Sequence, residues 1–103
     1  MSKHNGVRRF LDVSTCHVTA KDCELLSYDS ETHACGPQIA SVVAHPYGYW
    51  LIANSEDMES TLREHGYSEN LIAVMRKARA LDCAWINLDA DGTEHPDLNR
   101  HEW

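Results

Sequence analysis

The sequence has few of the motifs on which familiar enzymes depend. It has no glycine-rich phosphate loop, no GxSxG and no HExxH, and only 5 of its 103 residues are glycine. None of its 4 cysteines form a CxxC pair, which argues against a structural zinc site and favours free thiols. A basic stripe with interleaved aromatics is also missing, so direct nucleic-acid binding is not indicated. We therefore expect no enzyme activity, no cofactor and no metal.

Long hydrophobic runs are missing as well. The longest mostly apolar stretch, residues 39–44, is too short to span a membrane, and the first residues lead into no apolar signal segment. Hydrophobic residues make up 43% of the chain and charged residues 24%, which is ordinary for a soluble protein. A chain of 103 residues holds one core, so we expect a single domain over 1–103, in the cytoplasm and without a membrane partner.

The clearest periodic segment runs from residue 67 to residue 92. Ser68 is a suitable N-cap for a helix that ends near Leu81. The period then changes to that of a strand over residues 83–89, which closes at a turn ending in Gly92. The apolar positions of the helix form one stripe at a period of 3.6, namely Leu71, Ile72, Met75, Ala78 and Leu81.

The rest of the chain predicts a mixture of strands and helices. Residues 9–18 alternate as a strand, and a variant capping box at residues 19–22 starts a helix over 20–30. Two strands, 39–45 and 49–54, flank a short turn and form a hairpin; a short acidic helix then ends at Gly66. The order β-α-β-β-α-α-β predicts an α+β domain, with an antiparallel-rich sheet of about four strands and about three helices on one face.

Two local motifs resemble known functional sites, but each lacks a feature that such a site requires. Residues 87–92 resemble the start of a calcium loop, but Leu98 occupies the position that requires a bidentate Glu, so a turn is the better interpretation. Cys16 and His17 are adjacent, and on a strand adjacent side chains point to opposite faces, which does not give a nucleophile–base pair. A small metal-binding protein or an enzyme using His17 with Cys16 remains an alternative.

The net charge of −7 is unevenly distributed. Residues 22–69 carry a net −8 and residues 82–103 a net −5. An acidic face repels nucleic acid and favours basic protein partners, although solubility alone is an alternative explanation. The predicted acidic binding surface consists of Asp22, Glu24, Asp29, Glu31, Glu56, Asp57, Glu59, Asp89, Asp91, Glu94 and Asp97.

Three aromatic residues cluster around the predicted hairpin. Tyr47, Tyr49 and Trp50 lie in or directly after its turn. Aromatics beside acidic residues are typical of protein-binding patches, and they are equally suited to the half of a core that a sheet contributes. The pattern alone leaves both interpretations open.

The segment from Arg8 to Thr19 resembles a small uncharacterised family carried by plasmids, integrative elements and prophages. That family also has an aromatic hairpin at mid-chain and a segment like residues 62–68 followed by a helix and a strand. The resemblance implies a mobile-element accessory protein that acts in the cytoplasm of a bacterial host. Proteins of this kind accompany anti-restriction and anti-CRISPR genes, and no catalytic residue is implied.

From this resemblance we expect a stoichiometric inhibitor of a bacterial defence complex, of the anti-CRISPR type. It would bind a protein subunit at its nucleic-acid-binding surface as an acidic mimic, because a basic groove built for DNA also accepts carboxylates. The alternative is an anti-restriction or regulatory protein that binds through the hairpin aromatics instead of charge.

Overall fold

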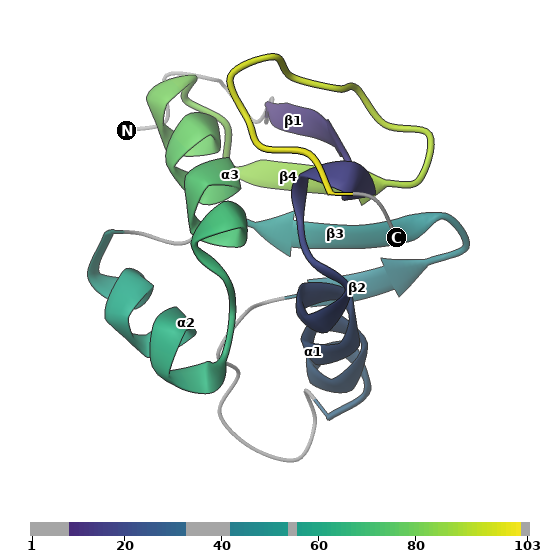
Figure 1. Cartoon of the computed structure of the whole chain (residues 1–103), viewed down its shortest axis with the longest axis vertical. Helices are drawn as coiled ribbons and strands as arrows, with labels where there is room; N and C mark the ends of the chain where they lie inside the picture. Colours follow the sequence, from purple (N-terminus) through teal and green to yellow (C-terminus); the bar gives the residue numbers. More distant parts are fainter. Residues whose placement is uncertain (1–8, 33–41, 54–55, 102–103) are drawn as a thin grey trace.

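A computed structural model describes residues 9–32, 42–53 and 56–101 of the chain. It has the predicted order of strands and helices, so the α+β class is confirmed (Figure 1). The elements are β1 (Phe10–Ser14), the 3-10 turn η1 (Thr15–His17), α1 (Ala20–Thr32), β2 (Val42–His45), β3 (Gly48–Ile52), the 3-10 turn η2 (Glu56–Met58), α2 (Glu59–His65), α3 (Glu69–Ala80) and β4 (Trp85–Asp89).

The four strands form one sheet in the order β1-β4-β3-β2 (Figure 1). The β2–β3 hairpin is antiparallel, as predicted, and β4 pairs antiparallel with β3. On its other side β4 pairs parallel with β1, with Phe10 opposite Trp85 and Ser14 opposite Asp89. The sheet is therefore mixed and not purely antiparallel, because the last strand inserts between the first strand and the hairpin.

One face of the sheet is covered by the helices. Leu11 and Val13 of β1, Ile86 and Leu88 of β4, and Leu51 of β3 are buried on that face. They belong to a single apolar cluster that also contains side chains from all three helices, namely Leu26, Leu62, Leu71, Ile72, Val74, Met75 and Ala78. The helices thus share one core with the sheet, and the alternate strand positions point to the other face.

That other face, here called the open sheet face, carries side chains that are exposed or only partly buried. Contacts between strands confirm that they share a side: Asn87 hydrogen-bonds to Asp12 and to His45, and the Phe10 ring packs against Trp50. The open sheet face consists of Phe10, Asp12, Val43, His45, Trp50, Ile52, Trp85, Asn87 and Asp89.

Three predicted helix ends are confirmed, whereas α1 extends beyond the predicted residue 30 to Thr32. Thr19 and Asp22 form reciprocal bonds, with Thr19 N donating to Asp22 Oδ2 at 3.0 Å and Asp22 N donating to Thr19 Oγ1 at 3.1 Å. Ser68 caps α3 by accepting from Leu71 N at 3.3 Å. Gly66 follows α2 with φ 110°, a left-handed conformation that glycine adopts without a steric penalty.

The first strand differs from the prediction. It ends at Ser14, because the Ser14 side chain accepts from Cys16 N at 3.2 Å and starts the η1 turn. Residues 15–18 therefore do not continue the alternation. The strand lies at an edge of the sheet, and Phe10 is 53% exposed. Residues 39–41 and 54 of the predicted hairpin lie outside the described residues.

The segment after β4 runs back along the outer side of β1 (Figure 1, yellow). Ser14 N donates to Thr93 O at 2.8 Å, and His101 N donates to Cys16 O at 2.7 Å. Leu98 packs against the core. Among the residues that the structure describes, no helix is long and apolar enough to cross a membrane.

Candidate functional site

Three of the predicted acidic binding residues are in the interior, which corrects the prediction for them. Asp22, Asp29 and Glu59 are all buried. The Asp22 carboxylate caps α1 and also accepts from Ser68 N at 2.8 Å and from Ser68 Oγ, so it joins the starts of two helices. Because the Asp22 side chain is completely buried between these two helix starts, a partner cannot reach it.

Asp29 and Glu59 also form internal contacts. Asp29 accepts from Tyr67 Oη at 2.5 Å and lies 3.3 Å from His65 Nε2. Burial, followed by this hydrogen bond, raises the pKa of Tyr67. Glu59 accepts from Arg76 Nε at 3.0 Å and from Arg79 at 2.7 Å. The Arg76 bond, followed by the Arg79 bond, lowers the pKa of Glu59 to about 2.

The remaining predicted acidic residues do not form one continuous binding surface, because some form ion pairs within the chain and the others lie on different elements. Asp97 forms an ion pair with Lys77 at 2.7 Å, and Glu94 forms one with Arg100 at 3.1 Å. The Glu56 side chain lies outside the described part of the chain. The others come from three separate parts of the fold: Glu24 and Glu31 from α1, Asp57 from η2, and Asp89 and Asp91 from the end of β4 and the turn that follows it.

The three hairpin aromatics have different environments. Tyr47 is 65% exposed in the turn. Tyr49 lies on the covered face, packs against the core, and its hydroxyl hydrogen-bonds to Ser27 Oγ and to Cys23 O. Trp50 lies on the open sheet face and is half-buried. The core interpretation therefore holds for Tyr49 only.

An apolar band crosses the open sheet face. Phe10 and Trp50 meet edge-to-face, with ring centroids 5.1 Å apart and planes at 78°. Phe10 is 53%, Val43 63% and Ile52 38% exposed, and Trp85 lies between Phe10 and Ile52 in the strand register. A monomer seldom exposes a contiguous apolar patch without a function for it. Phe10, Val43 and Ile52 are not among the predicted binding residues, although each alternates with a buried neighbour, which is a usable signal in the sequence.

A polar row lies beside this band on the same face. Asn87 Nδ2 donates to Asp12 Oδ1 at 3.1 Å, and Asn87 Oδ1 lies 2.9 Å from His45 Nε2. Asp12 Oδ2 accepts from Thr93 N at 2.9 Å and from Thr93 Oγ1 at 2.8 Å. The row therefore links β1, β4 and β2 and fixes the orientation of the polar side chains. Asp12 was not among the predicted binding residues.

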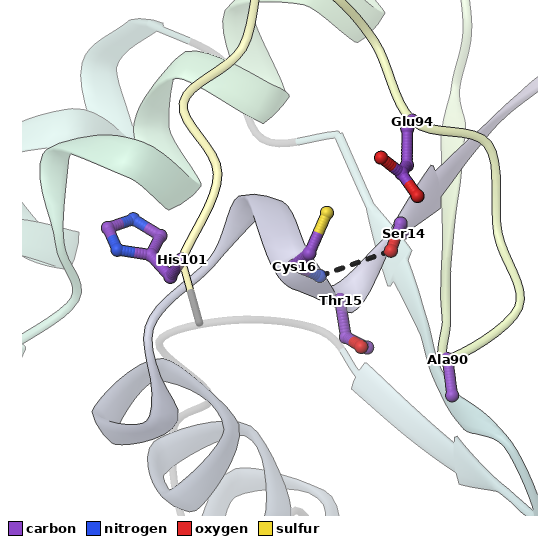
Figure 2. A pocket seen from close by; sticks show the side chains of 6 residues that line it. All are labelled: Ser14, Thr15, Cys16, Ala90, Glu94 and His101. Atoms are coloured by element: carbon purple, nitrogen blue, oxygen red, sulfur yellow. Dashed lines mark hydrogen bonds between the residues drawn. The ribbon is translucent and has the colours of Figure 1, made fainter. Parts of the chain in front are cut away.

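A pocket of about 370 Å³ lies at the end of β1 (Figure 2). Figure 2 shows the Cys16 sulfur and the His101 imidazole pointing in different directions, and the only bond drawn is from Cys16 N to Ser14 Oγ. The buried His101 Nε2 has no hydrogen-bond partner in the part of the chain that the structure describes. The described residues thus contain no nucleophile–base pair here. The pocket is lined by Ser14, Thr15, Cys16, Ala90, Glu94 and His101.

His17 does not act with Cys16 in this pocket. It is buried, and its Nδ1 lies 2.6 Å from Asn99 O while His95 N donates to its Nε2 at 2.8 Å. Both ring nitrogens are therefore used to hold the C-terminal segment. Burial, followed by the charge of Asp22, raises the pKa of the Cys23 thiol to about 11, which keeps that thiol protonated and unreactive at neutral pH. In the described ranges, no group of three or more His, Cys, Asp or Glu side chains is arranged to hold a metal ion.

Comparison with known proteins identifies one family. Residues 10–103 match the profile of the C-terminal domain of a family of unknown function (DUF5983). No curated protein and no solved structure matches the chain.

Proposed function

The chain belongs to the DUF5983 family, and we propose that it is a non-catalytic module that binds a protein partner through the open sheet face. The single observation that carries this proposal is the exposed apolar band from Phe10 across Trp50 to Val43, on a face that none of the described helices covers. Aromatic side chains that are partly exposed and held rigidly by a sheet are typical of the centre of a protein interface.

The charges around the band support a basic partner. The strand positions of the open sheet face include two carboxylates, Asp12 and Asp89, and no lysine or arginine. Asp91 is exposed just after β4. With a net charge of −7, the chain attracts a positively charged surface over distances near the Debye length, about 8 Å at physiological salt.

The specific role we propose is a mobile-element-encoded inhibitor of a bacterial defence complex, of the anti-CRISPR type. The resemblance of Arg8–Thr19 to a mobile-element family supports this role. A basic nucleic-acid-binding subunit is the partner that matches an apolar band flanked by carboxylates. This changes the predicted mechanism: contact is made by one face of the sheet instead of by acids spread over 22–102.

A phage-plating assay tests both the role and the surface. Cells with an active CRISPR system and cells with a restriction system only would express the wild type, the face variant Phe10→Ser/Val43→Ser, or the control variant Tyr28→Ser/Leu81→Ser. The control residues are 59% and 44% exposed and lie on helix α1 and at the end of helix α3, away from the open sheet face.

The expected result is restored plaquing in the CRISPR strain by the wild type and the control variant, and loss of this rescue with the face variant. Rescue in the restriction strain alone would instead support the anti-restriction alternative. Equal rescue by the face variant would show that the open sheet face is not the binding surface. No rescue in either strain would contradict the proposed inhibition of these systems.

A further inference from the structure

The polar row on the open sheet face has a defined direction. Tyr47 N donates to His45 Nδ1 at 3.2 Å, and a backbone N–H can only donate, so neutral His45 carries its proton on Nε2. That proton goes to Asn87 Oδ1, which leaves the Asn87 amide nitrogen to donate to Asp12. The row therefore ends at the Asp12 carboxylate, and every donor in it points toward β1.

Two carboxylates on this face keep unused acceptor capacity. A carboxylate has about four acceptor positions, and Asp12 fills three, with Asn87 and two atoms of Thr93. Among the described residues, Asp89 accepts only from Asp91 N, at 2.8 Å. Within the described residues, neither carboxylate forms an ion pair with a lysine or arginine of the chain. Both are therefore able to accept from a donor that a partner supplies.

These carboxylates lie next to the aromatic band. Asp12 and Trp50 occupy the same level of the sheet, each opposite Asn87, and Asp89 is two residues further along β4. On β3 the residue opposite Asp89 is Gly48, which contributes no side chain between Asp89 and His45. A ligand group on this part of the face thus meets an aromatic surface and carboxylate oxygens together.

We infer that the open sheet face takes arginine side chains of the partner protein, an inference that rests on the proposed function. A guanidinium stacks on aromatic rings and donates in a planar fork to carboxylates, so it satisfies both parts of the site at once. A lysine ammonium is a compact, strongly hydrated charge that satisfies the carboxylates but gains less from the rings. A phosphate backbone would be repelled by Asp12 and Asp89.

The test uses the full chain and short blocked peptides that differ in one kind of residue. The probes are acetyl-Gly-Arg-Leu-Arg-Leu-Gly-amide and the same peptide with lysine or with uncharged citrulline in place of arginine. Binding is followed by the shifts of backbone amide signals during titration. We expect the arginine peptide to bind at least ~3-fold more tightly than the lysine peptide, and the citrulline peptide to bind most weakly. The shifts should map to β1, β3 and β4.

Matched variants locate the contact. Trp50→Leu should remove the arginine preference, and Asp89→Asn should weaken the binding of both the arginine and the lysine peptide. Asp57→Asn and Tyr28→Ser, at exposed positions away from the open sheet face, should keep both the affinity and the preference. Since Trp50 is half-buried, its variant is checked for a native amide spectrum, and Phe10→Ser serves as the second aromatic variant. Equal affinity for arginine and lysine peptides, or shifts that map to the helices, would overturn the inference.

The outcome is separable from that of the plating assay. Defence inhibition by a protein without arginine preference would leave the proposed function standing and overturn the inference. An arginine preference located on the open sheet face, in a protein that inhibits neither defence system, would establish the site and overturn the proposed role.

Discussion

The Nε2 atom of His17 accepts a hydrogen bond from the backbone N–H of His95 at 2.8 Å, across 78 positions of sequence. This nitrogen must be unprotonated, so in the neutral ring Nδ1 carries the proton and donates it to Asn99 O at 2.6 Å. One buried imidazole thereby fixes two points of a C-terminal segment that has no regular secondary structure.

Replacement of His17 by Phe should destabilise the protein by about 3 kcal/mol, because the His95 N–H and the Asn99 carbonyl lose their partner in a largely buried environment. Urea denaturation measures the change, and amide exchange at His95 should accelerate. The control is Asn70→Ala, which removes an exposed bond to the Asn99 side chain and should cost less than about 0.5 kcal/mol. Unchanged exchange at His95 would contradict this role of His17.

The hydrogen bonds of Glu59 should make the free energy of unfolding depend on pH in the acidic range. Its pKa is lowered to about 2 by the Arg76 and Arg79 hydrogen bonds, so its contribution is complete above the unfolded pKa near 4.5 and is lost as the pH falls toward 2. In the Glu59→Gln variant, the free energy of unfolding should fall less steeply over this window. Denaturation at several pH values measures this dependence, and the control is Glu64→Gln, at an exposed position. If the free energy of unfolding falls in parallel with pH in the wild type and in Glu59→Gln, Glu59 is not the source of the dependence.

Loss of the Tyr67 hydroxyl should cost about 2 kcal/mol, because Asp29 is then left with fewer donors in the interior. Burial and this bond raise the pKa of Tyr67, so the stabilisation is present below pH about 10 and declines at higher pH as the unfolded tyrosine ionises. The measurement is denaturation of Tyr67→Phe against Tyr28→Phe, together with ultraviolet titration of tyrosinate. Ionisation of every tyrosine near pH 10 in the folded protein would show that Tyr67 is not shielded.

Gly48→Ala should destabilise the hairpin. An added Cβ would lie 1.8 Å from Leu88 O, so β3 and β4 would have to separate at this point, at a cost of about 3 kcal/mol. Thermal or urea unfolding measures it, and Val43→Thr, on the exposed side of the same hairpin, is the control. A stability equal to that of the wild type would mean that the two backbones do not approach this closely.

The features predicted correctly depend on neighbouring residues. The Thr19–Asp22 box, the Ser68 cap and the Gly66 helix end involve residues within three or four positions of one another, so the sequence alone was enough. The parallel pairing of β1 with β4 depends on residues about 75 positions apart, and no local pattern specifies it. This pairing is the reason why the sheet is mixed.

The binding site was harder to predict for the same reason. Asp22 and Asp29 resemble surface acids in a helical pattern, and their partners Ser68 and Tyr67 come from much later in the chain. Both faces of β3 carry large side chains, so the alternation of Tyr49 and Trp50 did not reveal which side the helices cover. Cys16 and His17 were placed on a strand because the pattern does not show that Ser14 caps a turn.

The place of β4 has a consequence for the order in which the domain is made. Of the four described strands this one leaves the ribosome last, yet it is hydrogen-bonded on both sides, to β1 and to β3. Closing a long loop costs conformational entropy, and this cost is offset only when the contacts between the distant strands have formed. A nascent chain that stops before Trp85 has its β2–β3 hairpin but lacks the strand that joins this hairpin to β1, so the four-stranded sheet assembles only after residues 85–89 have been synthesised.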